Sequence, residues 1–200
     1  MPTVAAVLIG YLIGSVPFGY LAGKLHGRDI RDHGSGNIGT TNAFRLLGPA
    51  WAVAVLLLDA GKGLAACFVA AQLAGGASTI AIAAGGLAAV AGHNWSVFLR
   101  FRGGKGAATT AGIFLYMAPA VAAAGLGVAA LTLMLTRYMS LGSMLGVVAG
   151  AVLMQFGGHP GPYRVAALVA LVWLVWQHRE NIGRLRRGQE RKMGMSRREE

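Results

Sequence analysis

The stretch Leu46–Leu99 reads LLGPAWAVAVLLLDAGKGLAACFVAAQLAGGASTIAIAAGGLAAVAGHNWSVFL, and its only charged residues are Asp59 and Lys62. A transmembrane helix needs about 20 predominantly apolar residues, so this stretch is too long for a single crossing. The pair Gly75-Gly76 in the middle of this stretch is typical of a turn. The stretch therefore predicts two membrane-spanning helices, near 49–74 and 77–99, joined by a short connection.

The composition of the whole chain agrees with that interpretation. The chain has 200 residues, of which 55% are hydrophobic and 12% charged, and 18 Lys and Arg against 7 Asp and Glu give a net charge of +11. Soluble domains carry about 25% charged residues, and disordered chains have low hydrophobicity, so both classes are excluded. The single cysteine, Cys67, excludes an intrachain disulfide. The composition predicts a basic, polytopic, all-α membrane protein.

Further apolar stretches predict the remaining crossings, at Thr3–Gly23, at 107–136, within 138–163 before a turn at Gly157–Pro162, and at 165–177. As one helix, 107–136 would be about 45 Å long, against a hydrocarbon core of about 30 Å. We therefore divide it near Ala118–Pro119, which gives about seven transmembrane helices. Six helices with one re-entrant segment remain the alternative.

The distribution of basic residues predicts the orientation. They concentrate in three regions, 24–45, 100–106 and the tail from Arg179 onward. Cytoplasmic loops carry the excess of Lys and Arg, so we expect all three regions in the cytoplasm. This requires an even number of crossings between Lys105 and Arg179, which the divided 107–136 stretch supplies. The N-terminus is then outside and the C-terminus cytoplasmic.

The domain organisation follows from these crossings. Residues 1–187 form a single transmembrane domain, and residues 188–200 are expected to be a flexible, basic cytoplasmic tail. Nearby basic residues are expected to contact anionic lipid headgroups, namely Arg184, Arg186, Arg187, Arg191 and Lys192. The lack of interleaved aromatic residues argues against a nucleic-acid partner. Glycines spaced four apart favour helix packing within the chain over dimerisation, so we expect a monomer.

The first of three polar clusters is GSGNIGTTN at Gly34–Asn42, followed by Arg45. It matches the dinucleotide fingerprint G-x-G-x-x-G formally, but that motif follows a buried strand, and polar residues precede it here. Glycines let backbone N–H groups converge on an anion, and an arginine can hold a phosphate with two hydrogen bonds. The candidate anion-binding residues are Ser35, Gly36, Asn37, Thr41, Asn42 and Arg45.

The second cluster combines GHNW at Gly92–Trp95 with FRGGKG at Phe101–Gly106. The Gly-Gly-Lys-Gly sequence opens the next apolar helix, and a helix N-terminus beside a lysine is an anion site. Histidine and asparagine side chains within a crossing usually face a cavity. The candidate substrate-binding residues are His93, Asn94, Gly103, Gly104, Lys105 and Gly106.

The third cluster, HRENIGR, begins at His178 where the last crossing ends. His178 and Asn181 are three residues apart and therefore share a helical face. Asp59 and Lys62 have the same spacing, and we interpret them as a structural ion pair, with substrate binding by Lys62 as the alternative. The carboxylates are scattered and the histidines lack ligand spacing, so neither a metal nor another cofactor is expected.

Together, these segments resemble the bacterial membrane acyl-phosphate:glycerol-3-phosphate acyltransferase family. The matching motifs are GSGNIGTTNAFR (Gly34–Arg45), LDAGKG (Leu58–Gly63), GHNWSVFLRFRGGKGAATT (Gly92–Thr110) and HRENIGRL (His178–Leu185). One departure is Thr40, where the family usually has alanine.

The resemblance implies transfer of a fatty acyl group from acyl-phosphate to sn-glycerol 3-phosphate, giving lysophosphatidic acid and phosphate in phospholipid biosynthesis. It implies a multi-pass protein of the bacterial inner membrane with its active site on the cytoplasmic side. We expect the catalytic residues to be Ser35, Arg45, Lys105, His178 and Asn181. The departing phosphate is expected to accept the hydroxyl proton, with His93 or His178 as the alternative base. A transporter for a phosphorylated metabolite and a non-catalytic scaffold are the competing functions.

Overall fold

The computed structural model describes residues 1–76 and 78–194, and its regular elements within these residues are all helical, which confirms the all-α prediction. The elements are α1 (Pro2–Ser15), α2 (Phe18–Leu25), α3 (Thr40–Leu47), α4 (Pro49–Leu73), α5 (Thr79–Asn94), η1 (Val97–Leu99), α6 (Ala107–Met117), α7 (Pro119–Thr136), α8 (Met139–Phe156), α9 (Gly161–Gln177) and α10 (Arg179–Arg186).

Five helical stretches in the described residues are long and apolar enough to cross a membrane. They are Pro2–Leu25, Pro49–Leu73, Thr79–Leu99, Pro119–Thr136 and Met139–Phe156. The apolar helices α6 and α9 are shorter. Many large apolar side chains on these helices face outward, including Leu57, Leu131 and Val172. Such a surface suits lipid rather than water.

Most of the predicted helix boundaries agree with the structure, but α9 begins at Gly161 rather than at 165, and one predicted helix is interrupted. The 107–136 stretch divides at Ala118–Pro119, as expected, because Pro119 is the first residue of α7. The crossing predicted over Thr3–Gly23 agrees with the candidate span Pro2–Leu25, but it is not a single helix, since the chain breaks between Ser15 and Phe18. Pro17 causes this break, because proline has no N–H to continue the helical hydrogen bonds.

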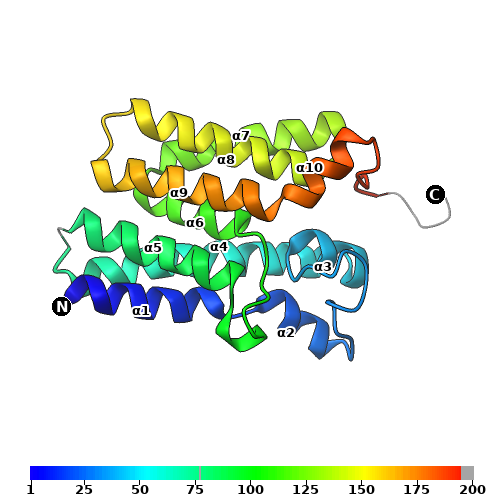
Figure 1. Ribbon diagram of the computed structural model, residues 1–200, viewed down its shortest axis with the longest axis horizontal. Coiled ribbons are helices and arrows are strands. Elements are labelled where there is room, and N and C mark those ends of the chain that lie inside the picture. Colours follow the sequence, from blue (N-terminus) through cyan, green and yellow to red (C-terminus); the bar gives the residue numbers. More distant parts are fainter. Residues whose placement is uncertain (77, 195–200) are drawn as a thin grey trace.

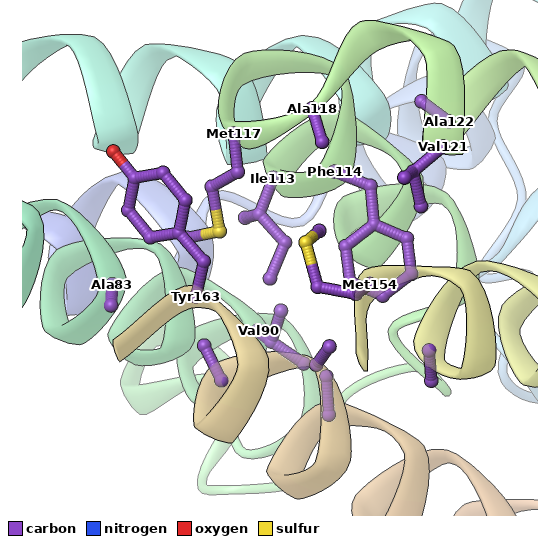
Figure 2. Close-up of a cluster of buried hydrophobic side chains, with 14 of the residues drawn as sticks. Ala83, Val90, Ile113, Phe114, Met117, Ala118, Val121, Ala122, Met154 and Tyr163 are labelled. Atoms are coloured by element: carbon purple, nitrogen blue, oxygen red, sulfur yellow. The ribbon is translucent and has the colours of Figure 1, made fainter. Parts of the chain in front are cut away.

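The core of the bundle surrounds α6, which packs against α4, α5, α7, α8 and α9. Ile113 and Phe114 of α6 meet Met154 of α8 in a tightly packed apolar cluster (Figure 2). Ile113 and Met154 are completely buried. Between helices that are surrounded by lipid, such side chains stabilise the bundle through close van der Waals packing rather than through removal from water. This core fixes the start of α6, from which the candidate site is built.

Small residues let the helices approach closely at several crossings. Gly10 and Gly14 of α1 lie directly against Gly85 and Ala89 of α5, where an added Cβ would overlap backbone atoms. The glycines spaced four residues apart therefore serve packing within the chain at this crossing.

The ends of the bundle differ in character. The N-terminus and the α8–α9 connection lie at one end of the long axis, whereas α2, α3 and α10 gather at the other (Figure 1). The polar clusters singled out in the sequence belong to this second end, so the fold collects them in one place.

Candidate active site

A cavity of about 730 Å³ opens among the elements at this end of the bundle. Its walls come from the 34–45 loop and α3, the 93–95 and 101–108 segments, the start of α8, and the 177–191 segment. All three polar clusters therefore meet, although they are far apart in the sequence. Of the fifteen residues predicted for the site, fourteen line this cavity, and Lys62 is the exception.

The 34–45 loop is held in shape by Asn42. The Asn42 Nδ2 donates to the carbonyl oxygens of Ile30 (2.7 Å) and His33 (3.1 Å), and its Oδ1 accepts from the N–H of Ser35 (3.0 Å). The side chain is 1% exposed. Because these bonds span both sides of the loop, Asn42 places Ser35 at the cavity wall.

The short helix α3 follows this loop and carries Arg45. It begins after Gly39, whose N–H donates to Asn37 Oδ1 (2.9 Å). The side chains of Asn37 and Asn42 thus shape the loop from both ends, while Thr41 and Arg45 line the cavity. The sequence did not predict α3, because an amphipathic helix of eight residues lies within a stretch that reads as a polar loop.

The Gly103–Gly106 segment passes closely over the end of α5. Gly103 N–H donates to Asn94 O (3.1 Å), and Gly104 N–H donates to His93 O (2.9 Å). A Cβ on Gly104 would overlap the imidazole Nε2 of His93. Gly106 has a φ of +79°, in the left-handed region that favours glycine. The glycines are therefore required by close approach and backbone conformation.

Lys105 lies between these glycines and faces the C-terminal part of the chain. Its Nζ donates to Asn181 Oδ1 of α10. Burial, reinforced by the positive charge of Arg184, lowers the pKa of Lys105 to about 8. Lys105 is therefore still mostly protonated at neutral pH, and it is available to neutralise an anion in the cavity.

His178 lies at the junction of α9 and α10. Its Nδ1 is 2.9 Å from the carbonyl oxygen of Leu174, which can only accept, so Nδ1 carries the proton. Nε2 is 3.4 Å from Ser143 Oγ. Burial and the charge of Lys105 lower the pKa of His178 to about 4. The ring is therefore neutral at pH 7.

Glu190 is a cavity residue that the sequence reasoning missed. Its carboxylate accepts from Asn181 Nδ2 (2.6 Å), Ser140 Oγ (2.7 Å) and Arg184 Nε (2.8 Å). Its side chain is 7% exposed. Burial alone would raise its pKa, but these donors and the charge of Arg184 hold the pKa below its usual value.

Glu190 lies in the 188–200 segment, for which a separate flexible tail is predicted. Residues 195–200 of that segment lie outside the described residues. The only local signal for Glu190 is an acidic residue within a strongly basic run. Ser140, Ser143 and Arg184 were also missed, although Ser140 and Ser143 share a helical face in an otherwise apolar helix.

Asp59 and Lys62 form the expected ion pair, with Lys62 Nζ 2.8 Å from Asp59 Oδ1. The ammonium also donates to the carbonyl oxygen of Val16 (3.0 Å). Both side chains are 3% exposed. The structure thus places Lys62 behind the cavity wall, whereas Asp59 and His93 reach it.

The cavity as a whole carries an excess of basic groups. The basic side chains along it are Arg45, Arg102, Lys105, Arg179, Arg184 and Arg191, and the carboxylates are Asp59, Glu180 and Glu190. Within residues 1–76 and 78–194, no three His, Cys, Asp or Glu side chains are grouped as a metal site would require. The arrangement is suited to binding anions such as phosphate groups.

Comparisons with known proteins agree with this chemistry. The family model described as glycerol-3-phosphate acyltransferase matches residues 4–188. The chain is 44% identical over 198 residues to the glycerol-3-phosphate acyltransferase of Shouchella clausii, with 96% of each chain covered. It is 46% identical to the Rubrobacter xylanophilus enzyme of the same name, covering 97% of this chain and 96% of the relative.

Two crystal structures are also similar along nearly the whole chain. They show PlsY (YgiH), an integral membrane glycerol 3-phosphate acyltransferase, in its glycerol 3-phosphate form and in its lysophosphatidic acid form. The TM-scores are 0.92 and 0.90, at 36% and 35% identity, and each match covers 97% of this chain and 96% of the other.

Proposed function

We propose that this chain, which belongs to the glycerol-3-phosphate acyltransferase family, transfers a fatty acyl group from acyl-phosphate to the 1-hydroxyl of sn-glycerol 3-phosphate. The products are lysophosphatidic acid and inorganic phosphate. The names of the relatives support the acceptor and the class of reaction, and the acyl-phosphate donor is our inference from the site.

The observation that carries this proposal is the meeting of two glycine-rich segments, each with its own cation, in one cavity. Arg45 follows the 34–42 loop, and Lys105 lies within the 103–106 segment. Glycerol 3-phosphate and acyl-phosphate each carry a phosphate group, so two anion sites match two substrates. A donor without a phosphate at its reacting end would use only one of them.

The reaction needs positioning and charge neutralisation more than a covalent intermediate. The 1-hydroxyl oxygen attacks the carbonyl carbon of the acyl-phosphate, and the bond between that carbon and the phosphate oxygen breaks. The hydroxyl proton passes to the departing phosphate. Acyl-phosphate is already activated, so holding both substrates in place supplies most of the rate enhancement.

The protein groups take positioning roles in this scheme. Ser35, Arg45, Lys105 and Asn181 hold the two phosphates and orient the hydroxyl. His178 is neutral with its proton on Nδ1, so Nε2 faces Ser143 and can accept a hydrogen bond. A general base on His93 or His178 is the alternative, and it would give the pH–rate profile an acid limb that a glutamine variant lacks.

The arrangement in the membrane is part of the proposal. Seven crossings, including the short helices α6 and α9, place the N-terminus outside and the cavity on the cytoplasmic side of the bacterial inner membrane. α6 is about 16 Å long, and it begins at the cavity wall. A monomer surrounded by lipid contains every group that the scheme uses.

The test uses purified protein in detergent, labelled glycerol 3-phosphate, and either acyl-phosphate or acyl-CoA. Lysophosphatidate formed from acyl-phosphate alone supports the proposal, and the Lys105→Met variant is the inactive control. Lysophosphatidate formed from acyl-CoA alone would refute acyl-phosphate as the acyl donor. No product from either donor, together with uptake of glycerol 3-phosphate into proteoliposomes, would indicate a transporter.

A further inference from the structure

A group of buried polar side chains lies at and behind the cavity wall, and the proposed scheme gives it no role beyond His93 as the alternative base. Asp59 and Lys62 of α4 and His93 of α5 are all less than 5% exposed, within helices that are otherwise apolar. Burying charged groups in a membrane protein costs free energy, so such groups usually have a functional reason to be there.

We propose that Asp59 and His93 are positioning residues for Lys105. Asp59 orients the imidazole ring of His93, and His93 holds the Gly103–Gly104 segment so that Lys105 reaches Asn181 and the substrate phosphate. The inference rests on the proposed function, because it assumes that Lys105 contacts a phosphate group.

The first step in this chain of contacts fixes the Asp59 carboxylate. Lys62 Nζ lies 2.8 Å from Asp59 Oδ1 and also donates to Val16 O (3.0 Å). Val16 lies in the break between α1 and α2, where the carbonyl has no helical partner to its C-terminal side. Lys62 therefore connects α4 to the α1–α2 break and holds the carboxylate in one place.

The second step connects the carboxylate to the imidazole. Asp59 Oδ1 is 3.6 Å from His93 Nδ1. Within the described residues, Nδ1 has no hydrogen-bond partner, and the His93 ring is buried. At this separation the carboxylate acts on the ring electrostatically, and it favours the orientation in which Nδ1 faces α4. Nε2 then faces the opposite way, toward Gly104.

The third step connects the imidazole to the lysine. Gly104 lies so close to Nε2 of His93 that a Cβ would overlap the ring. The N–H groups of Gly103 and Gly104 donate to the carbonyl oxygens of Asn94 and His93. Lys105 follows directly, so a rotation of the His93 ring would displace the backbone that carries its side chain.

The end of α5 is itself anchored, which makes it a firm support for this segment. Tyr11 OH donates to Trp95 O (2.8 Å), and Ser96 Oγ donates to Ser15 O (2.6 Å). These bonds connect the turn after α5 to α1. The backbone at the end of α5 is therefore fixed, whereas the His93 ring can still rotate about its side-chain bonds. Asp59 is the group that sets the orientation of this ring.

The test measures binding of sn-glycerol 3-phosphate by calorimetry to the full-length protein in detergent, without an acyl donor. The variants are Asp59→Asn, His93→Gln and the double variant, and Cys67→Ala is the control from the same helix, α4. Each single variant is expected to weaken binding about tenfold or more. If Asp59 acts through His93, the double variant binds glycerol 3-phosphate no more weakly than whichever single variant has the lower affinity.

The thermal unfolding temperature of each variant separates positioning from general damage. Cys67→Ala removes buried volume away from the cavity, so it is expected to lower the unfolding temperature without changing the dissociation constant. Should Asp59→Asn fail to fold because it leaves Lys62 without its counter-charge, Asp59→Asn/Lys62→Met removes both charges together and serves in its place.

Two results would overturn the inference. One is that the losses of affinity in Asp59→Asn and His93→Gln multiply in the double variant. The other is that Asp59→Asn and His93→Gln bind glycerol 3-phosphate as tightly as the control Cys67→Ala when all three have similar unfolding temperatures. Wild-type protein that does not bind glycerol 3-phosphate would instead refute the proposed function, and this inference with it.

Discussion

Lys105, two residues before α6, and Asn181 in α10 are 76 positions apart in the sequence, yet Lys105 Nζ donates directly to Asn181 Oδ1. The side-chain amide of Asn181 also contacts Glu190, because its Nδ2 donates to Glu190 Oε1 (2.6 Å). The glycine-rich segment and the C-terminal helix therefore form one unit. A change at any of these three residues is expected to affect the position of the other two.

The pKa of Lys105 predicts an alkaline limit to activity. Below pH 8 the ammonium is protonated and can hold a phosphate, and kcat/KM is expected to fall as the pH rises through about 8. The second pKa of a phosphate monoester, near 6, lies too low to cause this limb. An arginine side chain stays charged throughout the measurable pH range, so the Lys105→Arg profile should lack the limb at a lower overall activity. An unchanged limb in Lys105→Arg would assign it to another group.

Gly104→Ala is predicted to be severely impaired, because the added methyl group would overlap the His93 ring. Displacing Lys105 by about 1 Å is expected to lower kcat/KM roughly 100-fold. Gly127→Ala in α7 is the matched control, since a Cβ there has no heavy atom within 4 Å. Steady-state kinetics on both variants make the comparison. Near-normal activity in Gly104→Ala would contradict the close packing of this segment.

Glu190→Gln is expected to destabilise the protein by about 2 kcal/mol, because a buried carboxylate that accepts from three donors is replaced by an amide. The thermal unfolding temperature in detergent measures this loss. Glu180→Gln is the control, as the Glu180 side chain is 76% exposed. Equal unfolding temperatures for the two variants would show that the contacts of Glu190 contribute nothing to stability.

His178 is predicted to contribute no acid limb between pH 5 and 7, because burial and Lys105 lower its pKa to about 4 and keep it neutral there. His178→Gln should lower the rate at every pH in this range by a similar factor, through lost positioning. The measurement is kcat/KM against pH for both proteins. A wild-type limb near pH 6 that the variant lacks would identify His178 as a titrating base.

The proposed seven crossings place the chain termini on opposite faces of the membrane. In a Cys67→Ala background, Pro2→Cys should react with a membrane-impermeant maleimide from outside intact cells, and Gln189→Cys only after permeabilisation. Both positions are exposed in the structure. Labelling of both from the same side would favour six crossings.

Hydropathy was sufficient to predict most of the helices but not their interruptions. The division at Ala118–Pro119 followed from a stretch too long for one crossing, and the structure confirms it. The break at Val16–Pro17 was missed because the stretch was defined by its lack of charged residues, and an uncharged proline does not interrupt such a stretch. The amphipathic helix α3 was missed for the opposite reason, since its mean hydropathy is that of a loop.

The sequence by itself determined the class of protein, because long apolar runs are stable in lipid and costly to expose to water. It also determined most of the residues that gather at the cavity, because polar side chains within such runs are costly in lipid unless they face a polar site. Tertiary structure alone decided which of those residues meet. Glu190 joins Asn181 and Arg184, and Lys62 lies behind the cavity wall, although its ion pair with Asp59 was predicted from their spacing. The reason is geometric: local spacing gives the face of a helix, but the partner of that face depends on packing between distant segments.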